Sequence, residues 1–160
     1  MKNSEKLNMK KKIILVVLVA LYFGYSIYNT KKTRELELAI SYSSLRQSNW
    51  VKTINLCDKM LQYIPNHPDA NFAKAGALAQ HGQYQKAIAP YDRAIEYHYL
   101  GGCRRLLHES YYMKGDCLRN IGELEQALES CDLAIKHGYE HRSIFNLRNN
   151  ILMELGRFPG

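Results

Sequence analysis

Apolar and small residues recur at helical spacing in two stretches of the chain, 82–95 and 122–135, that resemble each other closely. Each stretch carries an i, i+3, i+4, i+7 stripe, which predicts a helix with one buried face. The stripe positions are Tyr84, Ala87, Ile88, Tyr91, Ala94 and Ile95 in the first copy, and Leu124, Ala127, Leu128, Cys131, Ala134 and Ile135 in the second. Both copies open on a glycine, which suits the left-handed turn that ends a preceding helix.

A second apolar stripe comes before each of these glycines, so the repeating unit is a helix, a glycine turn and another helix. The residues of these earlier stripes are Phe72, Ala75 and Ala79, and then Tyr111, Gly115 and Leu118. Two helices that pack at about 8–10 Å need small side chains where they cross. The pattern therefore predicts an all-α fold, a short α-solenoid of helical hairpins.

This pattern resembles the tetratricopeptide repeat, a helical hairpin of about 34 residues. The resemblance assigns four segments along the chain: a weak first repeat at 34–67, a second at 68–101, a third at 108–141 and a capping helix at 142–160. An aspartate stands at the same place in the second helix of all three repeats, as Asp58, Asp92 and Asp132. The cap is expected to shield the apolar face of the last hairpin.

Three features depart from the family pattern. Residues 102–107 are an insertion between the second and third repeats. Pro90 falls inside a predicted helix, where it removes a hydrogen bond and is expected to kink the helix at a cost of up to about 3 kcal/mol. Lys74 occupies a position where an apolar residue is usual in the family.

An uncharged apolar run at residues 13–28 follows a basic flank at residues 1–12. As a helix it would be roughly 24 Å long, and flanking lysines can extend it to the headgroups of a bilayer with a core of about 30 Å. The run predicts one transmembrane helix that acts as an uncleaved signal anchor. A cleaved secretory signal and a buried helix of a soluble protein are the alternatives.

The distribution of Lys and Arg around this run bears on topology. More of them precede the run than follow it, which favours a cytoplasmic N-terminus with the repeats across the membrane, as in a bacterial inner-membrane protein facing the periplasm. Because positive residues flank both ends, cytosolic repeats remain the alternative.

The net charge of +7 comes entirely from residues 1–34, which hold eight Lys and Arg residues and one acid. The rest of the chain holds equal numbers of bases and acids and is neutral. A neutral repeat domain lacks the basic field that attracts phosphate backbones, so no nucleic-acid partner is expected.

Candidate chemistry is sparse. The chain lacks a glycine-rich phosphate loop, a nucleophile elbow and a C-x-x-C pair, so no enzyme activity and no cofactor are expected. A zinc site at Cys131, His137 and His141 is a weak alternative to exposed histidines. The cysteines are expected to pack as small apolar groups, and a bridge between Cys103 and Cys117 is an alternative in an oxidising compartment.

The family resemblance implies a concave groove lined by the first helices of the hairpins. Carried over to this sequence, the candidate partner-binding residues are Leu38, Tyr42, Leu45, Phe72, Gln80, Tyr112, Asp116, Arg119 and Asn120. Large apolar and aromatic groups at such positions suit binding of a peptide or helix. Packing of some of them against the anchor linker or each other is the alternative.

Some tetratricopeptide domains hold a C-terminal carboxylate with basic and amide side chains. The corresponding positions here are Leu38, Tyr42, Glu109 and Met113, so capture of that kind is not expected. The sequence thus predicts a membrane-anchored scaffold or assembly factor that binds a protein or peptide. The alternative is a structural subunit of a larger membrane or envelope complex, of the secretion or pilus type.

Overall fold

The computed structural model describes residues 2–45, 49–101 and 104–157. Helix α1 runs over Lys2–Leu45. The chain divides into two compact units, Met1–Glu35 and Leu36–Gly160, so the C-terminal part of α1 belongs to the second unit. The predicted anchor and the start of the first repeat therefore lie on one helix, without a break at residues 29–33.

The first unit contains most of the apolar part of α1. Within the described residues one helix is long and apolar enough to cross a membrane, over Ile14–Ile40, with a mean hydropathy of 1.4. Its large apolar side chains, from Ile14 to Tyr25, are exposed. These properties suit a lipid environment, and they are also shared by signal sequences.

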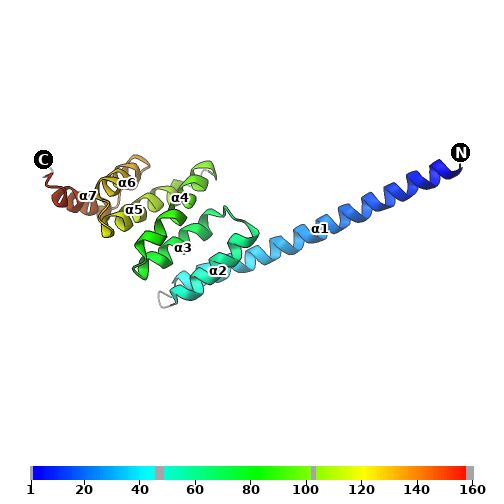
Figure 1. Ribbon diagram of the computed structural model, residues 1–160, viewed down its shortest axis with the longest axis horizontal. Helices are drawn as coiled ribbons and strands as arrows, with labels where there is room; N and C mark the ends of the chain where they lie inside the picture. Colours follow the sequence, from blue (N-terminus) through cyan, green and yellow to red (C-terminus); the bar gives the residue numbers. More distant parts are fainter. Residues whose placement is uncertain (1, 46–48, 102–103, 158–160) are drawn as a thin grey trace. The chain divides into compact units, whose positions relative to one another are not determined.

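The second unit is an all-α array of tetratricopeptide type. After α1 come α2 (Trp50–Tyr63), α3 (Pro68–Gln80), α4 (Tyr84–Gly101), α5 (Arg104–Asn120), α6 (Leu124–Lys136) and α7 (Arg142–Glu154). Each helix from α2 onward packs on the next one in chain order (Figure 1). The predicted fold class, helical hairpins followed by a further helix, is confirmed for the repeats.

Small residues at the predicted crossing points allow the helices of each hairpin to approach. Ala75 of α3 and Ala87 of α4 are both fully buried in one cluster with Tyr91. In the next hairpin, a Cβ atom on Gly115 of α5 would lie 3.2 Å from the backbone oxygen of Ala127 of α6. Glycine therefore allows the close approach of α5 to α6 at this crossing.

The glycine turns have the predicted left-handed backbone. Gly82 has a φ of 75° and Gly122 a φ of 84°, which L-residues with a side chain rarely adopt. The following amides close the turns, since Gln83 donates to the Leu78 carbonyl at 2.9 Å. This geometry reverses the chain within two residues and places the two helices of a hairpin side by side.

A histidine joins the end of α1 to the start of α3. His67 caps α3 by accepting a hydrogen bond from the Ala70 amide on Nδ1, at 3.3 Å. Its other ring nitrogen, Nε2, lies 3.1 Å from a carboxylate oxygen of Glu37. Because Nδ1 accepts, the proton of the neutral ring is on Nε2, which therefore donates to Glu37.

The helices on either side of the predicted insertion are longer than the other helices of their hairpins. Helix α4 has 18 residues and α5 has 17, whereas α3 and α6 have 13 each. Residues 104–107 of the predicted insertion belong to α5, and residues 102 and 103 lie outside the described part. Helix α4 continues through Pro90 to Gly101, so the proline does not end it.

Three ion pairs of one design connect successive hairpins. Lys74 Nζ lies 2.6 Å from Asp58, and Lys114 Nζ lies 2.6 Å from Asp92. The third pair joins Arg148 Nε to Asp132 at 2.7 Å. Each pair links the second helix of one hairpin to the first helix of the next. The aspartate shared by the repeats and the unusual Lys74 are therefore two halves of the same contact.

Candidate functional site

A pocket of about 560 Å³ lies among the first helices of the hairpins and is the candidate functional site. Its wall is contributed by α1, α2, α3, α4 and α5, all within the second unit. The lining residues are Ile40, Asn49, Trp50, Thr53, Asp69, Phe72, Ala73, Gly76, Ala77, Ala79, Gln80, Tyr84, Tyr91, Glu109, Met113 and Asp116. We call this pocket the groove. Its position agrees with the concave groove that the repeat pattern implies.

Two aromatic rings form much of the apolar wall. Phe72 of α3 and Tyr91 of α4 make an edge-to-face contact with ring centroids 5.9 Å apart. Tyr91 is buried, and burial raises the pKa of its hydroxyl, so the group is uncharged at neutral pH. Gly76 leaves space above this hydroxyl, because a Cβ atom there would be 3.8 Å from the tyrosine oxygen. This aromatic wall therefore offers an apolar surface with one polar atom, the Tyr91 hydroxyl oxygen.

The charge of the groove is negative. Among the described residues, its lining includes the carboxylates of Asp69, Glu109 and Asp116 and no Lys or Arg side chain; Asp69 already has an interaction partner. Burial raises the pKa of Asp116, and the nearby Arg119 only partly opposes this effect. A half-buried carboxylate that has lost hydration gains most from a cationic partner. The groove thus combines apolar surface with a carboxylate that is costly to leave unpaired.

Three of the candidate groove residues predicted from the sequence line this pocket: Phe72, Gln80 and Asp116. Leu38 does not line it, although its side chain is 66% exposed. Tyr42 and Leu45 lie on α1, and their side chains are outside the described part of the structure. For these residues the predicted role in binding stays a prediction.

The other three candidates, all on α5, contact groups outside the groove lining or the backbone of their own helix. Tyr112 stacks on Tyr139 with ring centroids 4.9 Å apart. Arg119 Nε donates to Glu154 of α7 at 2.7 Å. Asn120 donates to the backbone oxygen of Asp116, one turn earlier on the same helix. Their side chains serve internal contacts and are not part of the groove lining.

Second helices supply groove residues that the repeat analogy did not include. Trp50 and Tyr84 begin α2 and α4, and Tyr91 follows two turns later. Trp50 is held in place by stacking on His81, with ring centroids 3.5 Å apart. A signal was present, because Trp50 and Tyr84 occupy equivalent repeat positions. The apolar stripe predicts that Tyr84 packs within its hairpin, and the structure places it in the groove lining as well.

Cysteine chemistry is suppressed in the described part of the chain. Cys57, Cys117 and Cys131 are free and buried, and burial raises the pKa of each thiol to about 12. A thiol with such a pKa is protonated and unreactive at neutral pH. Cys103, the hypothetical partner of Cys117, lies outside the described residues. In the described ranges no three His, Cys, Asp or Glu residues gather to hold a metal ion.

Comparison with protein families places this geometry among known repeat proteins. The family model described as anaphase-promoting complex, cyclosome, subunit 3 matches residues 46–132 of this chain. The comparison with curated proteins found no match.

Several solved structures share the fold. The first TPR of Spaghetti (RPAP3), bound to the HSP90 peptide SRMEEVD, is 16% identical, with a TM-score of 0.69 over 79% of this chain and 94% of that chain. The TPR2B domain of yeast Sti1 in its pHsp70 complex is 22% identical, with a TM-score of 0.67 over 78% and 98%. The first TPR domain of human RPAP3 is 16% identical, with a TM-score of 0.64 over 74% and 91%. At these identities the likeness shows the tetratricopeptide fold.

Proposed function

Because the chain belongs to the family described as anaphase-promoting complex, cyclosome, subunit 3, we propose that its tetratricopeptide repeats bind a segment of a partner protein in the groove. The observation that carries this proposal is the 560 Å³ pocket, which joins the aromatic rings of Phe72 and Tyr91 to the carboxylates of Glu109 and Asp116. Tetratricopeptide scaffolds of this kind are typically non-catalytic. The work of the protein is accordingly recognition.

The charge of the groove defines the class of segment that it fits. A partner side chain of Lys or Arg would pair with Asp116, whose carboxylate is half-buried. A large apolar residue beside it would pack on Phe72 and remove that ring from water. The ligand class is therefore an apolar segment with one or two basic residues. An acidic segment such as the HSP90 peptide bound by the Spaghetti repeats would meet the carboxylates of Glu109 and Asp116 and be repelled.

The energetic gain comes from two different sources. Covering one large aromatic or aliphatic side chain is worth about 1.5–3 kcal/mol. A hydrogen-bonded charge pair at a partly desolvated carboxylate adds about 1.5–3 kcal/mol. Ordering the partner segment consumes part of this gain, so the affinity for a short peptide is expected to be modest.

A membrane anchor would compensate for modest affinity. The proposed anchor is residues 13–28, in the apolar part of α1. Holding the repeats at the surface where the partner resides raises its effective concentration, so weak binding becomes sufficient. In the proposed topology the N-terminus is cytoplasmic and the repeats are on the far side, because more Lys and Arg residues precede the apolar run.

A display experiment with the full chain in detergent tests the proposed ligand class. A random peptide library is selected on the immobilised protein, and enriched peptides are measured by fluorescence anisotropy. We expect peptides that pair an aromatic or aliphatic residue with Lys or Arg. Phe72→Ala and Asp116→Asn should each weaken binding by about tenfold. The controls are Phe145→Ala and Glu96→Gln, because Phe145 and Glu96 are exposed and do not line the groove.

Three outcomes decide the proposal. Loss of binding in the groove variants only supports it. Equal loss in the control variants, or enrichment of acidic peptides that depend on Phe72, contradicts it. Stable co-purification with a membrane complex through detergent, without peptide binding, would instead favour a structural subunit.

Protease accessibility of a C-terminal tag in sealed cells tests the proposed topology. The outer barrier, where there is one, is opened first. Digestion from outside supports repeats across the membrane. Protection until lysis places them in the cytosol and contradicts the charge-bias argument. A tag that fractionates as soluble protein contradicts the anchor itself.

A further inference from the structure

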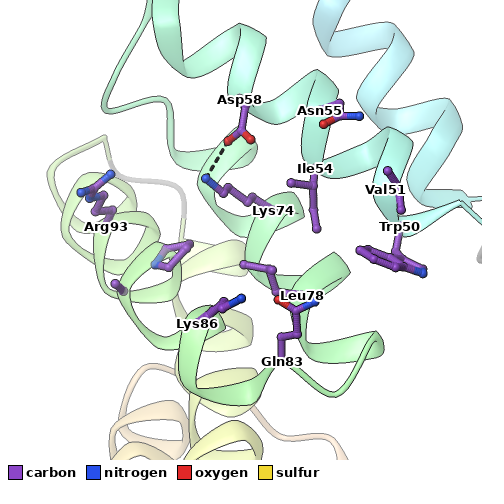
Figure 2. Close-up of a pocket in the computed structure, with 12 residues that line it drawn as sticks. Trp50, Val51, Ile54, Asn55, Asp58, Lys74, Leu78, Gln83, Lys86 and Arg93 are labelled. Carbon is purple, nitrogen blue, oxygen red and sulfur yellow. Dashed lines mark hydrogen bonds and ion pairs between the residues drawn. The ribbon is translucent and has the colours of Figure 1, made fainter.

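A second pocket lies between α2 and α4, the second helices of the first two hairpins, with α3 beneath them. Its volume is about 600 Å³, and Figure 2 shows the side chains that surround it. We call it the basic pocket. It shares only Trp50 with the groove, and its remaining wall comes from different residues. It is therefore a separate site that the proposed function does not use.

The apolar part of the basic pocket comes mainly from α2. Trp50, Val51 and Ile54 line it together with Leu78 of α3. Val51 is exposed, which is unusual for an aliphatic residue beside an indole. The stacking of Trp50 on His81 fixes the position of the indole ring. This wall can cover an apolar side chain of a partner without first reorganising.

The charged part of the basic pocket carries an excess of cations. Lys74, Lys86 and Arg93 line it with a single acid, Asp58. Asp58 is already paired with Lys74 at 2.6 Å (Figure 2). Within the described residues, Lys86 and Arg93 have no ion-pair partner. Two cations thus remain available to a ligand.

These two cations have a defined spacing. Lys86 and Arg93 are seven residues apart on α4, so they lie on one face of the helix, about 10.5 Å apart along its axis. Both side chains are exposed. Carboxylates that match this spacing stand seven residues apart on a partner helix.

We propose that the basic pocket is a second docking site, which binds an acidic amphipathic helix of a partner protein. An apolar residue of that helix covers Trp50, Val51 and Ile54. Two of its carboxylates, about two turns apart, pair with Lys86 and Arg93. The groove binds basic segments and this pocket binds acidic ones, so the neutral repeat domain carries two sites of opposite charge.

A protein partner fits this site better than a lipid surface does. Recruitment to anionic lipid takes clusters of about four to eight basic residues. The basic pocket has two cations without an ion-pair partner among the described residues, together with an indole and the aliphatic residues Val51, Ile54 and Leu78. A helix that carries apolar and acidic side chains can match these groups.

The test uses the full chain in detergent and a designed helical peptide. The peptide has leucines at i, i+3 and i+4, glutamates seven residues apart and a fluorescein label. A second peptide has every glutamate replaced by lysine. Binding is followed by anisotropy and by the fluorescence of Trp50, the only tryptophan of the chain. The test variant is a double substitution, Lys86→Glu with Arg93→Glu, which removes both available cations of the basic pocket.

A matched control exists on α2. Lys52 and Lys59 are also seven residues apart, are exposed and do not line either pocket. Changing both to Glu alters the net charge by the same amount as the test variant. Anionic vesicles containing phosphatidylserine serve as the alternative probe.

We expect the acidic peptide to bind the wild-type chain and to lose at least about tenfold in affinity in the test variant, because two attractions become repulsions. The control variant should stay within about twofold. Phe72→Ala in the groove should leave acidic-peptide binding unchanged, so this site can fail independently of the groove.

Four results would overturn the proposal. They are the absence of acidic-peptide binding, equal loss in test and control variants, loss with Phe72→Ala, and vesicle binding that depends on Lys86 and Arg93 while the peptide does not bind.

Discussion

Two glycines on the first helices of successive hairpins should respond oppositely to the same substitution. Gly76 of α3 and Gly115 of α5 both lie inside helices. Alanine is more favourable than glycine in a helix interior by about 1 kcal/mol. The difference between the two sites therefore depends on what the new methyl group contacts.

At Gly76 the added methyl has room. The nearest atom is the Tyr91 hydroxyl at 3.8 Å, which is ordinary contact. Gly76→Ala should raise the free energy of unfolding by about 0.5–1 kcal/mol. The same methyl would reduce the open space of the groove beside that hydroxyl.

At Gly115 the methyl is crowded from three directions. It would lie 3.2 Å from the Ala127 carbonyl oxygen, 3.3 Å from Cys131 Sγ and 3.4 Å from Ser130 Cβ. The closest of these atoms belongs to the backbone of α6, so the helices must separate. Overpacking of this kind costs about 1–3 kcal/mol, which cancels or exceeds the gain in helix propensity. Gly115→Ala should be neutral or destabilising by up to about 2 kcal/mol.

Urea unfolding of the two variants and the wild-type chain in detergent measures the difference. Trp50 fluorescence and circular dichroism are followed together, because coincident transitions are needed for a two-state free energy in a repeat protein. The dependence of the free energy on urea should be the same in all three proteins. Equal stabilisation by both substitutions would refute the argument that Gly115 is required for close helix packing.

Three further predictions follow from the contacts. Asp116→Asn should raise stability at neutral pH while weakening binding of basic peptides. The pKa of Asp116 is raised in the folded state, so its ionisation opposes folding. Wild-type stability should therefore decline relative to that of the variant as the pH rises through this pKa, which thermal unfolding of both proteins at several pH values would show. Lys114→Asp should lower the free energy of unfolding by about 0.5–1 kcal/mol, and the added substitution Asp92→Lys should recover part of this loss. Additive losses of stability in the double-mutant cycle would argue against the ion pair. Iodoacetamide should modify the buried thiols of Cys57, Cys117 and Cys131 only after unfolding. Rapid modification of these thiols in the native chain, detected by mass spectrometry, would contradict their burial.

The sequence alone determined the hairpins, because their requirements are local and periodic. A left-handed turn selects glycine at Gly82 and Gly122, and a close helix crossing selects small residues such as Ala87 and Ala127. Such requirements recur in every repeat, so the repeats of this one chain can be compared with each other to find them. The shared aspartates were visible in the same way. Their basic partners, including Lys74, could be identified only from the tertiary structure, because each partner lies on the first helix of the next hairpin.

The groove depended on tertiary structure. Phe72 and Tyr112 occupy the same position in successive repeats, yet Phe72 lines the groove whereas Tyr112 stacks on Tyr139. Arg119 likewise pairs with Glu154 of the last helix. What covers a repeat position is decided by the residues of the neighbouring hairpin, which differ along the array. Repeat numbering therefore locates the helices, while the particular side chains packed across each position decide which surfaces remain open to a partner.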